Sequence, residues 1–500
     1  MENNLQLHPN QLIRFLNKPS SQFTKRDIIR FFVENEFKMI NFRYVAGDGR
    51  LKTLNFVVSS LVQLDQILTH GERVDGSSIF YYIDPSQSDL YVIPRFRTAF
   101  VNPFSEIPTI DILCSYYTMD GTKLDSAPEN IVEKAHREFT RSTGMIFTAM
   151  GELEYYVISE KDTLYEPKTQ QGYHESSPFS KWEKLRCEAM QMIAQAGGNI
   201  KYGHSEVGNI IGDEYHMEQH EIEFLPAPIE EAADQIVLAK WILRMLGYKY
   251  GVSISFAPKV IVGHAGSGLH IHTKLIKDNK NQMINNGKLS ETALKSIVGY
   301  LKMAPSLTAF GNTVPISYLR LVPNQEAPTT VCWGDTNRSA LVRVPLGWLD
   351  GSDMVNDANP NETEDASQIP EYQTVEFRAP DGSANIHFLL AGLAMAAKYG
   401  FELEDAQSIS KQLYIKENVF SEDFLKMDKE LRHLPTSCWQ SSNSLERNRH
   451  IYEINNVFPP DLIDGIIKKL RSYHDQNLSE ELFGKIDDIK KLVDQYLYAF

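Results

Sequence analysis

The sequence predicts an α+β protein with a strand-rich amino-terminal domain and a larger domain of mixed strands and helices. Residues from about 38 to 118 are rich in β-branched and aromatic residues, with frequent turns. Beyond about residue 121, strand-like and helix-like segments alternate. The sequence has no Gly-rich loop of the kinds that bind nucleotides in doubly wound folds. We therefore predict domains at residues 1–121 and 122–500.

In the amino-terminal domain, "MINFRYVAGDGRLKTLNFVV" reads as a β-hairpin closed by Gly47, Asp48 and Gly49. The segment "DGTKLDSAPENI" ends this strand pattern. Ser126 and Pro128 are start signals for a helix. The apolar positions of that helix are Ile131, Val132, Ala135 and Phe139.

Three further segments of the second domain show helical periodicity. "SKWEKLRCEAMQMIAQAGG" is a helix ended by Gly197 and Gly198, and "IEEAADQIVLAKWILRML" is strongly amphipathic. The tail from about residue 461 repeats apolar residues at helical spacing. Between them, "SGLHIHTKLI" reads as a strand that turns at "KDNKN".

Composition excludes several classes of protein. The formal net charge is −15, with 65 acidic residues against 50 Lys and Arg, which argues against nucleic acid or an anionic membrane as partner. The start "MENNLQLHPN" lacks the pattern of a secretory signal, and the apolar run "FLLAGLAMAA" is too short to span a bilayer. The four cysteines are scattered without metal-binding spacing. We expect a cytoplasmic protein with reduced thiols.

The strand "TAMGELEYYVISE" carries Glu152 and Glu154 two residues apart, so both carboxylates emerge on one face. Like charges at that distance repel, and burial increases the repulsion. Either this face is solvated, or a cation lies over it.

The same spacing of polar residues recurs in other segments. The pairs are His270 with His272, Glu376 with Arg378, and Glu221 with Glu223, while Glu206 lies in "HSEVGN" upstream. One such pair is most often the solvated face of a half-buried strand. Several together indicate a site for Mg²⁺ or Mn²⁺, because carboxylate oxygens and an occasional imidazole suit these ions. Two ions would let both carboxylates of the first pair stay charged, an arrangement typical of phosphate transfer.

Arginines supply the complementary charge. Arg338 and Arg343 lie in "WGDTNRSALVRVP", and Arg320 and Glu326 lie in "SYLRLVPNQEAPTT". An isolated arginine is more often in a surface ion pair, but its fork also matches phosphate and carboxylate groups. Together with the acidic pairs, these residues predict a Mg²⁺-dependent enzyme of phosphoryl transfer.

These segments also resemble a known family. "VDGSSI", "GELEYY", "EQHEIEF", "GSGLHIH", "RLVPNQEAP", "NRSALVRVP" and "EFRAPDGSAN" are similar, in order, to the motifs of glutamine synthetase, type I. The resemblance runs from about residue 38 to 475. It implies an amino-terminal β-grasp domain, then a catalytic domain whose antiparallel strands line a funnel. It also implies a homo-oligomer, a dodecamer of two hexameric rings with active sites shared between neighbouring subunits.

The resemblance implies two metal sites for Mg²⁺ or Mn²⁺. The first set of ligands would be Glu154, Glu206 and Glu221. The second, on the phosphates of ATP, would be Glu152, His270 and Glu376.

It also implies roles in binding glutamate, ammonium and ATP. Arg338 and Arg343 would contact the nucleotide phosphates, and His272 would lie beside the nucleotide. The glutamate-side residues would be Arg320, Arg378 and Gly266, with Glu326 on a flap over the site. The ammonium pocket would be formed by Asp75, Ser78 and Tyr173.

The implied reaction makes L-glutamine from L-glutamate and ammonia through γ-glutamyl phosphate. Ammonium must lose a proton before it attacks, and Asp75 is the candidate base. By residue type alone, Asp75 in "VDGSSI" is an ordinary turn aspartate bonded to nearby amides.

Several positions depart from the family pattern. They are Ala265, Ile316, Lys201, Lys274 and Thr374, which fall at substrate and nucleotide contacts rather than at the metal ligands. The leading hypothesis is a glutamate–ammonia ligase. One alternative is a γ-glutamyl ligase that uses a larger amine or polyamine. Another is a catalytically silent structural relative.

Overall fold

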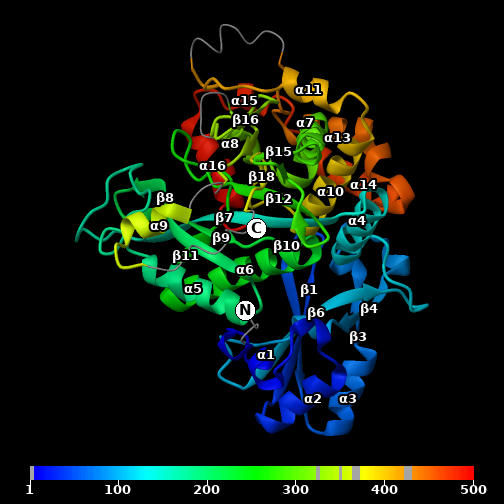
Figure 1. The fold of residues 1–500 in the computed structure, drawn as a ribbon. Helices are drawn as coiled ribbons and strands as arrows, with labels where there is room; N and C mark the ends of the chain where they lie inside the picture. Colours follow the sequence, from blue (N-terminus) through cyan, green and yellow to red (C-terminus); the bar gives the residue numbers. More distant parts are fainter. Residues whose placement is uncertain (1–4, 323–326, 348–351, 363–371, 422–430) are drawn as a thin grey trace.

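The computed structural model describes residues 5–322, 327–347, 352–362, 372–421 and 431–500 (Figure 1). The amino-terminal domain, blue in Figure 1, lies below the larger domain. Its mixed sheet has the strand order β2-β1-β6-β4-β3, and β5 pairs with β6. Its strands are β1 Met39–Val45, β2 Leu51–Val57, β3 Glu72–Asp75, β4 Asp89–Pro94, β5 Phe100–Val101 and β6 Thr109–Tyr117. Three helices accompany the sheet: α1 Gln11–Leu16, α2 Lys25–Glu34 and α3 Leu61–His70.

The predicted hairpin is confirmed. Strands β1 and β2 pair antiparallel from Val45 opposite Leu51 outward. Gly49 in the connecting turn has a φ of 79°, in the region that favours glycine. Because β1 also pairs with β6 in parallel, its residues are buried on both faces, whereas β2 alternates in exposure.

The second sheet has the strand order β16-β17-β18-β12-β7-β9-β8, with β10 and β11 on β7 and β13 on β12. Neighbours along this order are antiparallel except for β16 and β17, which are parallel. Its long strands are β7 Ile146–Glu160, β8 Ile200–Ile211, β9 Tyr215–Phe224 and β12 Leu269–Lys277. The short ones are β10 Ala227–Pro228, β11 Ser253–Ser255, β13 Lys280–Asn281, β16 Trp333–Asp335, β17 Val342–Val344 and β18 Val375–Phe377. A separate hairpin joins β14 Ile284–Asn285 to β15 Lys288–Leu289.

Helices surround this sheet (Figure 1). The first group is α4 Pro128–Thr143, α5 Glu183–Gln195, α6 Ile229–Tyr250 and α7 Glu291–Gly311. The second is α8 Ser317–Arg320, α9 Ser352–Ala358, α10 Ile386–Glu402 and α11 Ala406–Gln412. The last is α13 Cys438–Tyr452, α14 Pro460–Arg471, α15 Leu478–Glu481 and α16 Ile486–Tyr496. The helix predicted after Ser126 is present, but its N-cap is Ala127, which makes no side-chain cap. Pro128 occupies the first turn, where its missing N–H costs nothing.

Helix α6 covers one face of β7 and leaves the other face for the charged side chains. A Cβ added at Gly151 of β7 would lie 2.9 Å from Ile236 of α6, so this face of the strand is covered by the helix. Successive side chains of a strand alternate between faces, so Glu152 and Glu154 emerge on the other side.

The two domains are joined by a buried ion pair. Arg95 donates from Nη1 and Nη2 to the two carboxylate oxygens of Asp234 on α6, at 2.7 and 2.9 Å. His387 of α10 lies 3.3 Å from the same carboxylate. These contacts fix the amino-terminal domain against the helices behind the second sheet.

Among the described residues, no single helix is long and apolar enough to cross a membrane. The bent pair α10 and α11 passes that test by length and composition, and α10 is buried along almost its whole length.

Candidate active site

Strand registry places the polar pairs of four strands on one face of the second sheet. His270 of β12 lies opposite Glu152 of β7, and His272 lies opposite Glu376 of β18. Arg343 of β17 lies opposite Glu376 on its other side. Side chains directly opposite one another on neighbouring strands are within contact distance. The pairs recognised along the sequence therefore form one continuous group.

The centre of this group suits a divalent cation. Oxygens of Glu152 and Glu376 and a ring nitrogen of His270 lie within 4.8 Å of one another. His270 Nδ1 is 2.8 Å from Glu152 Oε2 and 3.6 Å from Glu376 Oε1. His272 Nε2 lies 2.8 Å from the other Glu152 oxygen. Two carboxylates and an imidazole are a donor set that fits Mg²⁺ or Mn²⁺.

Two arginines neutralise this group. Arg378 Nε lies 2.9 Å from one oxygen of Glu376, and Arg343 Nη1 lies 3.0 Å from the other. Burial and the charge of Glu152 both act to raise the pKa of Glu376, but Arg378 and the two histidines outweigh them and lower it. Arg320 donates from Nη1 to the carbonyl of Ala379 at 2.8 Å and reaches within 3.5 Å of His270. The group can therefore hold charged carboxylates beside cationic forks suited to phosphate.

A second acidic group adjoins the first across β7, β9 and β8. Glu154 of β7 lies opposite Glu221 of β9, which lies opposite His204 of β8. His204 Nε2 is 3.2 Å from Glu221 Oε1, and its Nδ1 is 3.7 Å from Glu206. His204, Glu221 and Glu223 bring one ligand atom each within 4.8 Å of one another.

This set differs from the one expected for the first metal. Glu154 is oriented by its neighbours, because its Oε2 accepts from Gln219 Nε2 at 3.0 Å and from the Gly268 amide at 2.8 Å. Its Oε1 lies 4.0 Å from His270 Nε2, so it faces the boundary between the two groups. Sequence reasoning gave no role to His204, although it precedes Glu206 by the same two-residue spacing as the other pairs.

The second group concentrates negative charge. Burial raises the pKa of Glu221 well above its ordinary value, and the neighbouring carboxylates raise it further. Those carboxylates are Glu152, Glu154, Glu206 and Glu223. A bound cation would remove this repulsion, so the group is chemically suited to a second divalent ion or to ammonium.

One departure from the family pattern has a defined place here. Lys201 Nζ lies 2.7 Å from Glu223 Oε2, and the Tyr202 hydroxyl donates to the other oxygen of that carboxylate. Lys201 also lies over the Tyr202 ring, 4.6 Å from its centroid. Lys201 thus supplies local charge compensation at the edge of the acidic group.

Aromatic rings cover the same edge. Tyr173 stacks on His174 with centroids 4.2 Å apart and meets His204 edge-on at 5.5 Å. The pKa of Tyr173 is raised by burial and then by Glu206, while Arg338 opposes the rise. Tyr173 therefore lies close enough to the acidic group for the charge of that group to change its pKa.

The residues expected beside the nucleotide are divided between two strands and a loop. His272 Nδ1 lies 2.9 Å from the hydroxyl of Thr374, the residue that replaces an expected arginine. Lys274 follows on the same face of β12, half-buried, and burial lowers its pKa. Arg338 is exposed, and its backbone carbonyl accepts from Arg378 Nη1.

Close packing explains a glycine at position 266. A Cβ there would lie 2.5 Å from the carbonyl of Pro258, and the Gly266 carbonyl itself accepts from Gln219 Nε2 at 3.0 Å. The preceding Ala265 accepts from the Tyr156 hydroxyl at 2.8 Å through its carbonyl. Ile316 is buried at the start of α8.

Two predicted residues, Asp75 and Ser78, are not brought to this face within the described part of the chain. Asp75 is exposed at the end of β3 in the amino-terminal domain, where it accepts from the Ser77 amide at 2.9 Å and from the Ser78 hydroxyl at 2.6 Å. Hydrogen bonds from Ser78 and Ser77 lower the pKa of Asp75. In this chain both Asp75 and Ser78 form a local turn. Glu326 lies outside the described residues.

Known proteins match nearly the whole chain. The model of the glutamine synthetase catalytic domain matches residues 125–480, and that of the glutamine synthetase beta-grasp domain matches residues 36–119. Glutamine synthetase of Methylococcus capsulatus is 27% identical over 485 residues, 89% of this chain and 94% of that protein. Glutamine synthetase of Frankia alni is 28% identical over 482 residues, 88% and 94% of the two chains.

Solved structures share the fold. Plasmodium falciparum glutamine synthetase superposes with a TM-score of 0.74 at 20% identity, over 91% of this chain and 97% of that one. GmaS without ligand superposes with a TM-score of 0.72 at 17% identity, over 92% and 99%. With both family domains matched in order and the charged face assembled from the family's motifs, the chain belongs to the glutamine synthetase family.

Proposed function

We propose that this protein is an ATP-dependent glutamate–ammonia ligase that uses two Mg²⁺ or Mn²⁺ ions. One observation carries the proposal: Glu152, His270 and Glu376 converge beside Arg343 and Arg378. On the same sheet face, the second acidic group follows without a break. A phosphate-binding half and a cation-binding half therefore lie next to each other.

The reaction requires both halves. Glutamate's γ-carboxylate attacks the γ-phosphorus of ATP, which forms γ-glutamyl phosphate and releases ADP. Ammonia then attacks the acyl carbon of γ-glutamyl phosphate and displaces inorganic phosphate, and loss of a proton leaves glutamine. Divalent ions, when bound, would offset the charge that builds up as one anion approaches another.

The chain's own arginines support the first step. Arg343 and Arg378 are already aimed at the group by their ion pairs with Glu376, so they need little reorganisation to meet a phosphate. Arg320, held by the Ala379 carbonyl, is the candidate for the carboxylate of glutamate. The pairs keep these forks in place before substrate arrives.

The second step needs a base near the second acidic group. We assign this role to Asp75 of a neighbouring copy, because in its own chain Asp75 lies in the separate amino-terminal domain. This assignment implies a homo-oligomer with shared sites, and the family resemblance indicates two hexameric rings. Ammonium is a cation, so a carboxylate can first attract it and then accept its proton.

A specific observation favours a second candidate, a γ-glutamyl ligase for a larger amine. The edge of the acidic group is covered by the rings of Tyr173, His174, His204 and Tyr202. Aromatic faces attract alkylammonium groups, and their apolar surface would also contact the alkyl part of a larger amine, which ammonium lacks.

The deciding experiment measures phosphate release from ATP and glutamate with ammonium, methylamine, ethanolamine and a polyamine at equal concentrations. The proposal expects ammonium to give the highest kcat/KM. A preference for a larger amine would replace it with the second candidate. Phosphate release with none of the amines, in the presence of Mg²⁺ or Mn²⁺, would identify a catalytically silent relative. Glu152→Ala serves as the background control.

A further inference from the structure

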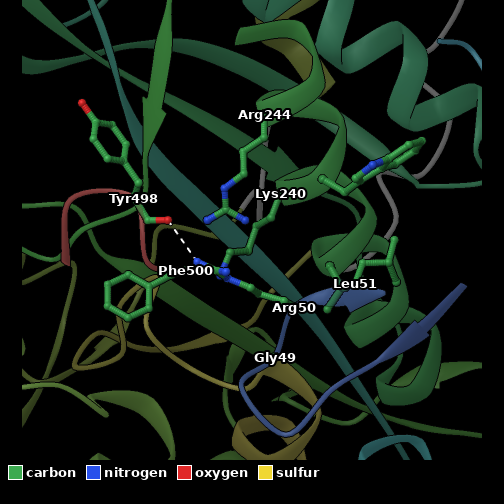
Figure 2. Close-up of a pocket in the computed structure, with 9 residues that line it drawn as sticks. Gly49, Arg50, Leu51, Lys240, Arg244, Tyr498 and Phe500 are labelled. Carbon is green, nitrogen blue, oxygen red and sulfur yellow. Dashed lines mark hydrogen bonds between the residues drawn. The ribbon is translucent and has the colours of Figure 1, made fainter. Parts of the chain in front are cut away.

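A cavity of about 340 Å³ lies between the two domains, separate from the charged face of the second sheet (Figure 2). Its walls come from the β1–β2 turn, helix α6 and the segment after α16. Helix α6 covers the opposite face of β7 from Glu152, so this cavity lies across the sheet from the candidate active site. Figure 2 shows Arg50, Lys240 and Arg244 converging on it.

The three cations come from two elements. Lys240 and Arg244 are one helical turn apart on α6, and both lie over the ring of Phe256, at 5.3 and 5.0 Å from its centroid. Arg50, from the turn, donates from Nε and Nη2 to the backbone carbonyl of Ala499 at 3.1 and 2.8 Å. These contacts hold the cationic groups in place, and no carboxylate of the described residues is among their hydrogen-bond partners.

Positive charge in the cavity is only partly offset, by Asp48 and Asp381, which oppose the lowering of the pKa of Lys240. Within the described part of the chain, Arg244 makes no ion pair, and its Nη2 is buried without a hydrogen-bond partner. Lys240 Nζ donates to the Gly382 carbonyl at 2.7 Å, and burial together with Arg244 lowers the pKa of Lys240 to about 7. Burial also lowers the pKa of Arg244 to about 10.

The two acids that act on Lys240 are also hydrogen-bonded to other groups. Asp48 accepts from the Arg50 amide and lies 3.8 Å from Lys52. Asp381 accepts from Asn312 Nδ2 at 2.8 Å and from the Ser383 amide at 2.9 Å. Lys240 is buried, Arg244 is half-buried and Arg50 is exposed, and none of the three makes an ion pair among the described residues. Buried cations are normally paired, so this group indicates a place for an anion.

We propose that this cavity binds a small organic anion, a phosphate monoester or carboxylate carrying a flat apolar group. The anionic end would meet Arg50 and Arg244, whose forks match both kinds of group. Trp241 and Phe500, which also line the cavity, would contact the apolar part. The volume is at the small end for ligand pockets, which suits a single ring with one anionic substituent.

Such a ligand would join three separate parts of the chain. It would connect the turn of the amino-terminal domain, helix α6 and the segment that follows α16. Binding therefore stabilises the relative position of the two domains and does not depend on the proposed reaction.

The test titrates phenyl phosphate, benzoate and inorganic phosphate into the full-length protein without metal or nucleotide, followed by calorimetry. Phenol, which lacks the phosphate group, is the uncharged comparison. We expect phenyl phosphate or benzoate to bind, and Arg244→Gln to weaken binding at least about tenfold, equivalent to the loss of one charge-assisted contact. Arg26→Gln, which removes an exposed arginine of α2, is the matched control and should bind as the unchanged protein does.

Arg50→Gln alters an exposed side chain and is the second variant, used if Arg244→Gln does not fold. It should also weaken binding. The location is checked by intrinsic fluorescence, because Trp241→Phe should remove the ligand-dependent change in signal. Equal affinity in the folded cavity variants and the Arg26→Gln control would overturn the proposal. Absence of binding at ligand concentrations up to about 10 mM would also overturn the proposal. A Kd of about 10 mM corresponds to a binding free energy of roughly −3 kcal/mol.

Discussion

The two halves of the candidate active site share one sheet face but differ in charge balance. Around Glu376, Arg378 and two histidines lower the pKa of a buried carboxylate, and Arg343 forms a further ion pair with it. Around Glu221, four further carboxylates and burial raise it. In the first half, cationic side chains balance the carboxylates without a ligand. In the second half, the carboxylates repel one another, and a bound cation would reduce this repulsion.

This difference indicates separate tasks for similar residue types. A neutralised group with aimed arginines is prepared for an anion that arrives with its own metal, such as a nucleotide phosphate. A group with excess negative charge is prepared for cations. Sites that store electrostatic strain of this kind are commonly functional, because stability alone would select against them.

The largest expected effect comes from removing one carboxylate from each half. Glu152→Ala and Glu154→Ala should each lower turnover on the order of 10³-fold or more, since each loses a candidate metal ligand. Glu152→Ala should mainly weaken nucleotide binding and Glu154→Ala should mainly weaken glutamate binding, measured by calorimetry. Glu160→Ala, at the exposed end of the same strand, is the control. Full activity of both variants with Mg²⁺ would contradict the two-metal interpretation.

The second prediction concerns the base that the cation half lacks in its own chain. Asp75→Asn keeps the turn but removes charge and basicity, so glutamine formation from ammonium should fall about 10²–10⁴-fold. Formation of γ-glutamyl hydroxamate from hydroxylamine, which is already largely neutral, should fall much less. Asp84→Asn is a matched control, because Asp84 accepts from the Ser86 amide and hydroxyl in the same way. Equal losses with both amines would mean that Asp75 serves folding or assembly.

Mixed assembly tests whether Asp75 acts across subunits. Oligomers formed from equal amounts of Asp75→Asn and Glu152→Ala chains should recover roughly one quarter of the normal sites, because each shared site draws one residue from each chain. No recovery in verified mixed oligomers would exclude shared sites. Native mass measurement on the unmixed protein checks that a ring assembly forms. An active monomer would also exclude shared sites.

The third prediction compares the halves by stability rather than activity. In metal-free protein, Glu221→Gln should raise the free energy of unfolding by about 1–2 kcal/mol, because it removes a carboxylate from the repulsive group. Glu376→Gln should lower it by roughly 2–4 kcal/mol, because Arg343 and Arg378 lose their charged partner.

Chemical unfolding with and without Mg²⁺ measures both effects. The stabilisation by Mg²⁺ should shrink in Glu221→Gln, since fewer carboxylates then favour the ion. A destabilised metal-free Glu221→Gln protein would show that the second group is not under electrostatic strain.

The smallest effect concerns the cationic cavity. Its excess charge is positive, whereas that of the second acidic group is negative. Because the pKa of Lys240 is lowered to about 7, the folded state binds fewer protons than the unfolded state between that pH and about 10.5. Stability should therefore rise with pH in this range, by about 1–2 kcal/mol between pH 7 and 9. Lys240→Met should flatten that rise in urea unfolding measured at pH 7, 8 and 9. An unchanged slope would mean that Lys240 is not the group that titrates.

Much of the fold follows from local sequence. The hairpin is predicted because two β-forming runs flank a turn whose Gly49 adopts positive φ. Helix α6 follows from apolar residues at helical spacing, and the predicted tail helix is present as α14, which buries Leu462, Ile463 and Leu470. The two-residue spacing also places Glu152 and Glu154 on one strand face before any tertiary information is available.

What the sequence could not supply is which residue lies opposite which. Strand registry between segments far apart in the chain puts His270 beside Glu152 and His204 beside Glu221, and registry depends on how whole strands bury their faces. The pairings of Lys201 with Glu223 and of Thr374 with His272 depend on the same non-local contacts. So does the cationic cavity, whose three positive residues come from a turn and a helix that carry no common motif. Local patterns determine the face on which a side chain emerges, whereas its partners, and therefore its charge state, are decided only when distant elements pack together.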